Sequence, residues 1–142
     1  MILSSHALQE RLQYESGLVI KPYSDVCQQP ASYDLRVGEE SILHKRLCTL
    51  VPTLEWVELP LDIAAMLRCR SSYARKGVLL GGGFVDPGFR GQLTLCLTNM
   101  GREVIALHRE DRVVQMILHQ VIGNDELYRG RYQDSLGVIR AR

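Results

Sequence analysis

The sequence predicts a mainly β domain of the sandwich or barrel type. After about residue 17, short runs of β-forming residues alternate with proline, glycine and polar turns, which is the pattern of an all-β domain. The clearest strand is Gln92–Thr98, in which three leucines on one face alternate with polar residues and Cys96 on the other. The length of 142 residues fits one hydrophobic core, so we expect a single domain over 1–142.

A short helix is expected at the N-terminus. Ser4 or Ser5 can cap residues 4–13 by accepting a hydrogen bond from a free backbone N–H. Leu8 and Leu12 are four residues apart, so they would share one face of this helix. An extended segment follows.

The remaining elements are mostly strands. Propensity alone would make 61–69 a helix, and 71–76 can form one helical turn. The triple glycine at 81–83 requires a turn or a close approach by another group. From about residue 123 the chain is polar, and this tail either stays mobile or closes over a ligand. The expected strands are 18–20, 54–59, 92–98, 104–107 and 112–118, with a pair of strands within 41–51.

Composition narrows the classes of function. A net charge of +1 argues against a dedicated nucleic-acid binder, although a few clustered arginines suffice to bind a small anion. No apolar run approaches the roughly 18 residues of a membrane span, and the N-terminus does not resemble a secretory signal. We therefore expect a cytoplasmic protein that binds neither membranes nor nucleic acids.

The cysteines and histidines are not spaced as metal ligands. Four cysteines and four histidines are scattered along the chain without a C-x-x-C pair. The zinc-deaminase pattern, H-x-E with P-C-x-x-C, is absent from the sequence. We expect free thiols and no zinc site.

The segment Arg70–Lys76 combines hydroxyl groups and cations. Ser71, Ser72, three basic side chains and the free N–H groups of a helical turn are suited to binding phosphate. The alternative is a solvated basic loop, because such loops are common.

The segment Gly83–Gly91 places Asp86 between an apolar run and a Pro-Gly turn. Glycines allow a backbone to approach a flat ligand closely, and an aspartate at a strand end can orient a water molecule or a sugar hydroxyl. The alternative is an ordinary Asp-Pro-Gly turn.

The third candidate is the tail segment Tyr128–Gln133, which is followed by Arg140 and Arg142. Aromatic and arginine side chains in such a tail can form a lid over a nucleotide. A solvated tail is the alternative.

Taken together, these segments resemble the dUTPase and dCTP deaminase family. The opening Ile2–Ser4 and the segment Pro30–Gly38 are similar to the start of a dCTP-deaminase-type chain. Further matches follow in order over nearly the whole chain, and five motifs in sequence are specific although none is decisive alone. These matches are Thr53–Glu55 with Val57–Pro60, Arg70–Gly77, Val85–Gly91 with Asn99, Asp111–Gln115 and Tyr128–Gln133.

The resemblance implies an antiparallel, jelly-roll-like β-barrel that assembles as a homotrimer with active sites between subunits. It also makes residues 64–69 a strand against their helix propensity, because tertiary pairing can override such a weak preference.

The resemblance also implies a role for each matching residue. Asp86 would contact the deoxyribose 3′-hydroxyl and, in the hydrolases, orient the attacking water. Phe89 would pack on the sugar and leave no room for a 2′-hydroxyl, with Thr94 and Cys96 also at the sugar or base. The implied phosphate-binding residues are Arg70, Ser71, Ser72, Arg75 and Gln115, with Mg²⁺ held by the triphosphate and not directly by the protein. The implied tail contacts are Tyr128, Arg131 and Gln133.

The chain departs from the deaminase pattern at two positions. Deaminases carry a glutamate on the strand after the third motif, where this chain has Cys96. A neutral thiol does not readily transfer the protons needed for water attack on cytosine and loss of ammonia. Hydrolytic dUTPases usually have an apolar residue there. Ser135 also replaces a glutamine that is frequent in deaminase tails.

The resemblance therefore favours hydrolysis of dUTP to dUMP and pyrophosphate. Three alternatives stay open: a dCTP deaminase that forms dUTP and ammonia, a catalytically inactive nucleotide-binding regulatory trimer, and a hydrolase for another deoxynucleotide.

Overall fold

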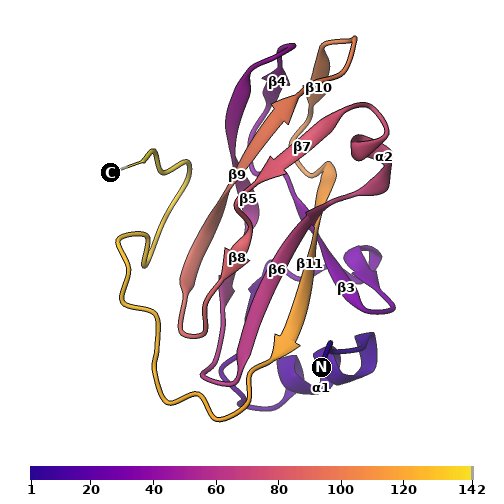
Figure 1. Ribbon diagram of the computed structural model, residues 1–142. Helices are drawn as coiled ribbons and strands as arrows, with labels where there is room; N and C mark the ends of the chain where they lie inside the picture. The colour runs from indigo at the N-terminus through magenta and orange to yellow at the C-terminus, as the bar shows by residue number, and fades with distance from the viewer. Residues whose placement is uncertain (142) are drawn as a thin grey trace.

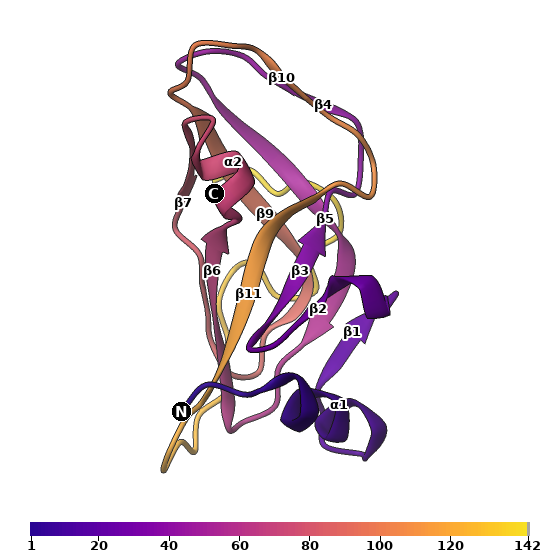
Figure 2. The ribbon, with the colours of Figure 1, turned by 90° about the vertical axis from the view of Figure 1, so that its right-hand side faces the viewer.

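The computed structural model describes residues 1–141 and confirms a mainly β fold with a short N-terminal helix. Helix α1 lies at one end of an elongated molecule, and the strand pair β4–β10 lies at the other (Figures 1 and 2). The elements are α1 (Ser5–Gln13), β1 (Val19–Lys21), η1 (Asp25–Cys27), β2 (Gln28–Gln29), β3 (Ser32–Arg36), β4 (Ser41–Leu43), β5 (Cys48–Glu58), β6 (Ile63–Cys69), α2 (Ser71–Ala74), β7 (Val78–Gly81), β8 (Phe84–Val85), β9 (Arg90–Asn99), β10 (Ile105–Leu107) and β11 (Arg112–Gln120).

The strands form three antiparallel sheets. One has the order β1-β5-β9-β7, the second has the order β2-β3-β11-β6-β8, and the third is the pair β10-β4. Within residues 1–141 the hydrogen bonds do not close these sheets into a barrel. The tail after β11 runs beside β8 and β9, on the opposite side of the molecule from β3 and β11 (Figures 1 and 2).

The alternation expected in Gln92–Thr98 is confirmed in β9. Leu93, Leu95 and Leu97 are buried in the core, while the residues between them are only half-buried. The face of β9 that carries Cys96 therefore points away from the core. This geometry places β9 between the core and the tail.

The N-terminal helix begins as the capping pattern predicts. The Ser4 hydroxyl accepts a hydrogen bond from the Ala7 N–H at 3.2 Å, and Leu8 is buried. The Arg11 guanidinium bonds to both oxygens of the Asp62 carboxylate at 2.9 and 2.7 Å, which ties α1 to the turn before β6. No helix within residues 1–141 is long and apolar enough to cross a membrane.

The helix that propensity favours over 61–69 is wrong. Residues 63–69 form β6, as the family resemblance implied, because β6 pairs with β11 along its whole length and with β8 on its other edge. Such pairing satisfies the backbone and outweighs a weak local preference.

The strands expected within 41–51 and at 54–59 are arranged differently. β4 pairs with β10, while β5 continues as one strand from Cys48 to Glu58. The register of β5 against β9 shifts between Pro52 and Trp56. Proline has no N–H for the ladder, so an irregularity at this point accommodates it within a long strand.

Candidate functional site

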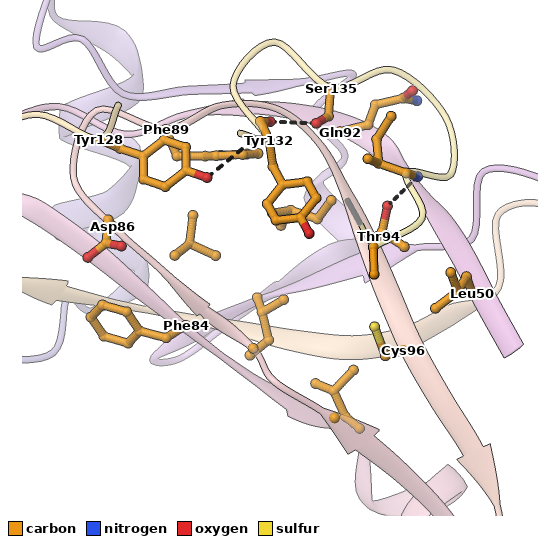
Figure 3. A pocket seen from close by; sticks show the side chains of 18 residues that line it. Leu50, Phe84, Asp86, Phe89, Gln92, Thr94, Cys96, Tyr128, Tyr132 and Ser135 are labelled. Carbon is orange, nitrogen blue, oxygen red and sulfur yellow. Dashed lines mark hydrogen bonds between the residues drawn. The ribbon is translucent and has the colours of Figure 1, made fainter. Parts of the chain in front are cut away.

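A cavity of about 390 Å³ lies between β7, β8, β9 and the C-terminal tail (Figure 3). Five residues that the sequence singles out line it: Asp86, Phe89, Thr94, Cys96 and Tyr128. Four of them come from the segment that follows β8 and from β9, which explains why their spacing in the sequence is short. The tail closes the remaining side.

The position of Asp86 follows from the turn that joins β8 to β9. The Phe89 N–H donates to the Asp86 carbonyl at 3.2 Å, and Gly88 adopts a φ of +86°, which other residues rarely adopt. The Asp86 carboxylate has no hydrogen-bond or ion-pair partner within residues 1–141. It is exposed at one end of the cavity, where it is available to bind water or a hydroxyl group (Figure 3).

Phe89 forms a wall of the cavity beside Asp86. It is only 6% exposed, and its ring meets the Tyr128 ring edge-on, with the centroids 5.8 Å apart. This packing fixes the orientation of Phe89, so the ring offers a rigid apolar surface to a ligand.

Cys96 lies at the other end of the cavity, away from Asp86 (Figure 3). Its neighbours across the sheet are Leu50 and Gly81, and the absent side chain at Gly81 leaves space beside it. Burial raises the pKa of the Cys96 thiol, with a smaller contribution from Cys48. The thiol is therefore protonated at neutral pH.

Two side chains of β9 hold the tail over the cavity. The Thr94 hydroxyl accepts a hydrogen bond from the Ile139 N–H at 3.0 Å, and the Gln92 side-chain oxygen accepts one from the Gly137 N–H at 2.6 Å. Gln92 was not among the candidate residues, although the alternation of β9 already placed it on the same face as Thr94 and Cys96.

The implied phosphate-binding residues lie outside this cavity. Ser71 and Ser72 begin α2, and Arg75 directly follows it. The side chains of all three have no protein partner within residues 1–141. They are therefore available to an anion, but no residue of this set lines the cavity that contains Asp86.

The Arg70 side chain already interacts with other residues of the protein. Its Nε lies 3.2 Å from the Oδ2 of Asp34, and its Nη1 donates to the Arg112 carbonyl at 3.0 Å. Asp34 is completely buried and also lies 3.6 Å from Arg112. Burial raises the pKa of Asp34, while the two arginines oppose that shift. This cluster holds the start of α2 against β3 and β11.

Gln115 lies on the same sheet face as Asp34, because the two residues are directly paired between β11 and β3. Its amide nitrogen lies 3.4 Å from the Ser32 hydroxyl. The candidate residues thus form two sets, one around the cavity and one around α2 and the neighbouring strands β3 and β11.

Gln133, an implied tail contact, is bonded to the turn that carries Asp86, and Tyr128 packs on Phe89. Arg131 interacts with other residues of the chain, but it does not line the cavity.

Residues 1–141 contain no group of three or more histidine, cysteine, aspartate or glutamate side chains that could hold a metal ion. Among the residues that the structure describes, Asp86 is the only one that contributes a carboxylate to the cavity lining. A divalent cation at this site would therefore take most of its ligands from a bound nucleotide or from water.

Comparisons with known proteins agree on one family. The family model described as dCTP deaminase-like matches residues 38–121. A dCTP deaminase of Thermococcus sibiricus is 36% identical, with 95% of this chain and 93% of that protein covered. A "dCTP deaminase, dUMP-forming" of Aquifex aeolicus is 29% identical, with 100% of this chain and 94% of that protein covered.

Two solved structures share the fold. The 2′-deoxycytidine 5′-triphosphate deaminase of Agrobacterium tumefaciens has a TM-score of 0.72 at 21% identity, over 84% of this chain and 47% of that one. The EIAV dUTPase has a TM-score of 0.62 at 25% identity, over 80% of this chain and 92% of that one. The family model over residues 38–121 and the 36% identity with a relative along almost the whole chain show that this chain belongs to the dCTP deaminase-like family.

Proposed function

We propose that this protein hydrolyses dUTP to dUMP and pyrophosphate. A water molecule oriented by the Asp86 carboxylate would attack the α-phosphorus and give up its proton to that carboxylate. A new oxygen–phosphorus bond would form as the bond from the α-phosphorus to the bridging oxygen breaks, and pyrophosphate would leave. Mg²⁺ bound through the phosphate oxygens would neutralise their negative charge.

The observation that carries this proposal is the pair of groups at the two ends of the cavity. Asp86 is a free carboxylate at one end, and Cys96 is a neutral thiol at the other. Deamination needs a group that can accept and return protons next to the pyrimidine ring. The thiol is poorly suited to this task, whereas hydrolysis needs no proton transfer at that position.

The second candidate is deamination of dCTP, which the names of the relatives favour. Incubation with dUTP or dCTP in the presence of Mg²⁺, with separate detection of pyrophosphate and ammonia, tests both candidates. Pyrophosphate from dUTP without ammonia from dCTP supports the hydrolase. Ammonia from dCTP identifies a deaminase. The absence of both products would favour an inactive nucleotide-binding protein.

Replacing Cys96 with valine separates the two reactions. If the protein is a hydrolase, we expect pyrophosphate release from dUTP to stay within a few-fold, because valine adds little more than one methyl group and no proton passes through position 96. The measurement is the steady-state rate of pyrophosphate release by wild type and variant. Ammonia release from dCTP that is present in the wild type and lost in Cys96→Val would contradict the proposal.

Phe89 is proposed to select deoxyribose. Its ring is held by Tyr128, and a 2′-hydroxyl against this apolar face would lose its hydrogen bonds with water, which costs about 1–3 kcal/mol. Such a cost corresponds to roughly 5- to 150-fold discrimination between dUTP and UTP.

We further propose that the active assembly is a homotrimer. The cavity contains Asp86 but not the phosphate set around α2, so a second copy would be needed to bring the two sets together. Apolar side chains on the outer sheet face support an interface here, because the exposed Phe84 pairs with the exposed Met66, and Met66 pairs with the half-buried Ile117. Phe84 also lines the cavity, so this face adjoins it.

Light scattering is expected to give a mass of three times 16.1 kDa at micromolar concentration. Met66→Lys should weaken the assembly, because it places a charge in the proposed interface. A monomeric wild type that is fully active would contradict the split site.

A further inference from the structure

The turn that joins β8 to β9 is bonded to the C-terminal tail along most of its length. The Tyr128 N–H donates to the Pro87 carbonyl at 2.7 Å, and the Asp134 N–H donates to the Arg90 carbonyl at 2.8 Å. Gly91 and Ser135 form a parallel bridge. Backbone hydrogen bonds therefore hold the tail against the turn and the start of β9.

The side chain of Gln133 adds two further bonds at the centre of this contact. Its Nε2 donates to the Gly88 carbonyl at 2.8 Å, and its Oε1 accepts from the Arg90 N–H at 2.8 Å. These two backbone groups flank Phe89. A primary amide can satisfy both of them at once because it carries a donor and an acceptor side by side.

The contact leaves little free space around the turn. A Cβ atom at Gly88 would lie 2.8 Å from both the Leu127 Cβ and the Tyr128 nitrogen. Displacement of the turn toward the tail is thus blocked sterically, and the amide of Gln133 opposes displacement away from it.

We infer that Gln133 is a positioning residue, which acts through the backbone of Gly88 and Arg90 to hold Asp86 and Phe89 in place. This inference rests on the proposed function, because it assigns Asp86 to the water and Phe89 to the sugar. The family resemblance would make Gln133 a contact to the nucleotide. In this chain both the oxygen and the nitrogen of its amide already bind the turn. A displacement of about 1 Å in an active site can cost roughly 10²-fold in rate.

The test is Gln133→Met, which keeps the length of the side chain and removes both hydrogen bonds. Amide hydrogen exchange at Arg90 is expected to become faster, because its N–H loses its acceptor. For dUTP, kcat is expected to fall by about 10- to 100-fold. KM should rise, and the preference for dUTP over UTP in kcat/KM should fall, since Phe89 is no longer held against the sugar. Gln133→Glu keeps the acceptor for Arg90 and should be intermediate in the exchange rate.

The matched control is Asp134→Asn, which removes the exposed ion pair with Arg90 and tolerates the positive φ of 58° at this position. Its kinetic constants should change by less than about two-fold, because exposed ion pairs contribute little. A variant that merely reduced the amount of folded protein would lower kcat without changing KM or the dUTP to UTP ratio.

Unchanged amide exchange at Arg90 in Gln133→Met would show that Gln133 does not hold the turn. Faster exchange with unaltered kinetics would show that holding the turn does not position the catalytic groups. If the wild type hydrolysed no nucleotide, the hydrolase proposal would fail separately. The same comparison would then use the ratio of the dissociation constants for dUTP and UTP, and an unchanged ratio in Gln133→Met would again contradict the inference.

Discussion

Asp86→Asn is expected to lower pyrophosphate release from dUTP by about 10²- to 10⁴-fold, the usual contribution of a general base. Asparagine has nearly the same shape, but its amide cannot accept a proton from the attacking water. Because the Asp86 carboxylate makes no bond to residues 1–141, the substitution removes no contact that supports the fold. The measurement is the single-turnover rate with Mg²⁺, alongside the thermal melting curve.

Asp125→Asn is a suitable control, because Asp125 is an exposed carboxylate outside the cavity. It should retain the activity of the wild type. If Asp86→Asn turned over dUTP at a rate close to that of the wild type, Asp86 would not be the base, and the proposed mechanism would have to be abandoned.

The largest expected effect on stability is at Glu55, which is completely buried in β5. Its two oxygens accept hydrogen bonds from Arg36, one from Nε at 2.7 Å and one from the backbone N–H at 2.9 Å. Glu55→Ala would leave the Arg36 guanidinium, whose side chain is 12% exposed, without its counter-charge. We expect the free energy of unfolding to fall by about 3–5 kcal/mol, as when one partner of a buried ion pair is removed.

Urea denaturation of the wild type and the variant measures this loss. Asp62→Ala is the comparison, because it breaks an ion pair with Arg11 that lies nearer the surface. The Arg11 side chain is 29% exposed and the Asp62 side chain is 44% exposed. That variant should lose no more than about 1 kcal/mol, as is typical for pairs near the surface. Equal losses in the two variants would mean that burial does not govern the contribution of ion pairs in this fold.

Where the information is local, the sequence predicted the structure well. The serine cap predicted the start of α1, and the alternation of Gln92–Thr98 predicted which face of β9 meets the core. That alternation also placed Thr94 and Cys96 on one face, which is the face that lines the cavity. A period of two residues is a property of the strand itself, so it can be read without knowing the neighbouring strands.

Pairing between distant segments could not be read in the same way. Residues 63–69 have the composition of a helix, yet they form a strand between β11 and β8. The short strand β7 (Val78–Gly81) was not expected, and it exists because it pairs with the end of β9. Backbone hydrogen bonds to a partner that is remote in the sequence decide these elements, and local propensity is too weak to oppose them.

The same distinction between local sequence and tertiary structure applies to the candidate site. The sequence by itself determined the family resemblance, the place of Asp86 before a Pro-Gly turn, and a cysteine at the position where the resemblance implies a glutamate in deaminases. Only the tertiary structure decided that the phosphate set lies outside the cavity, that Arg70 is bound to the buried Asp34, and that Gln133 holds the turn. The physical reason is that the sequence does not show which group a polar side chain will bind. Whether that side chain binds a nucleotide or a backbone group depends on which segments the fold brings within hydrogen-bonding distance.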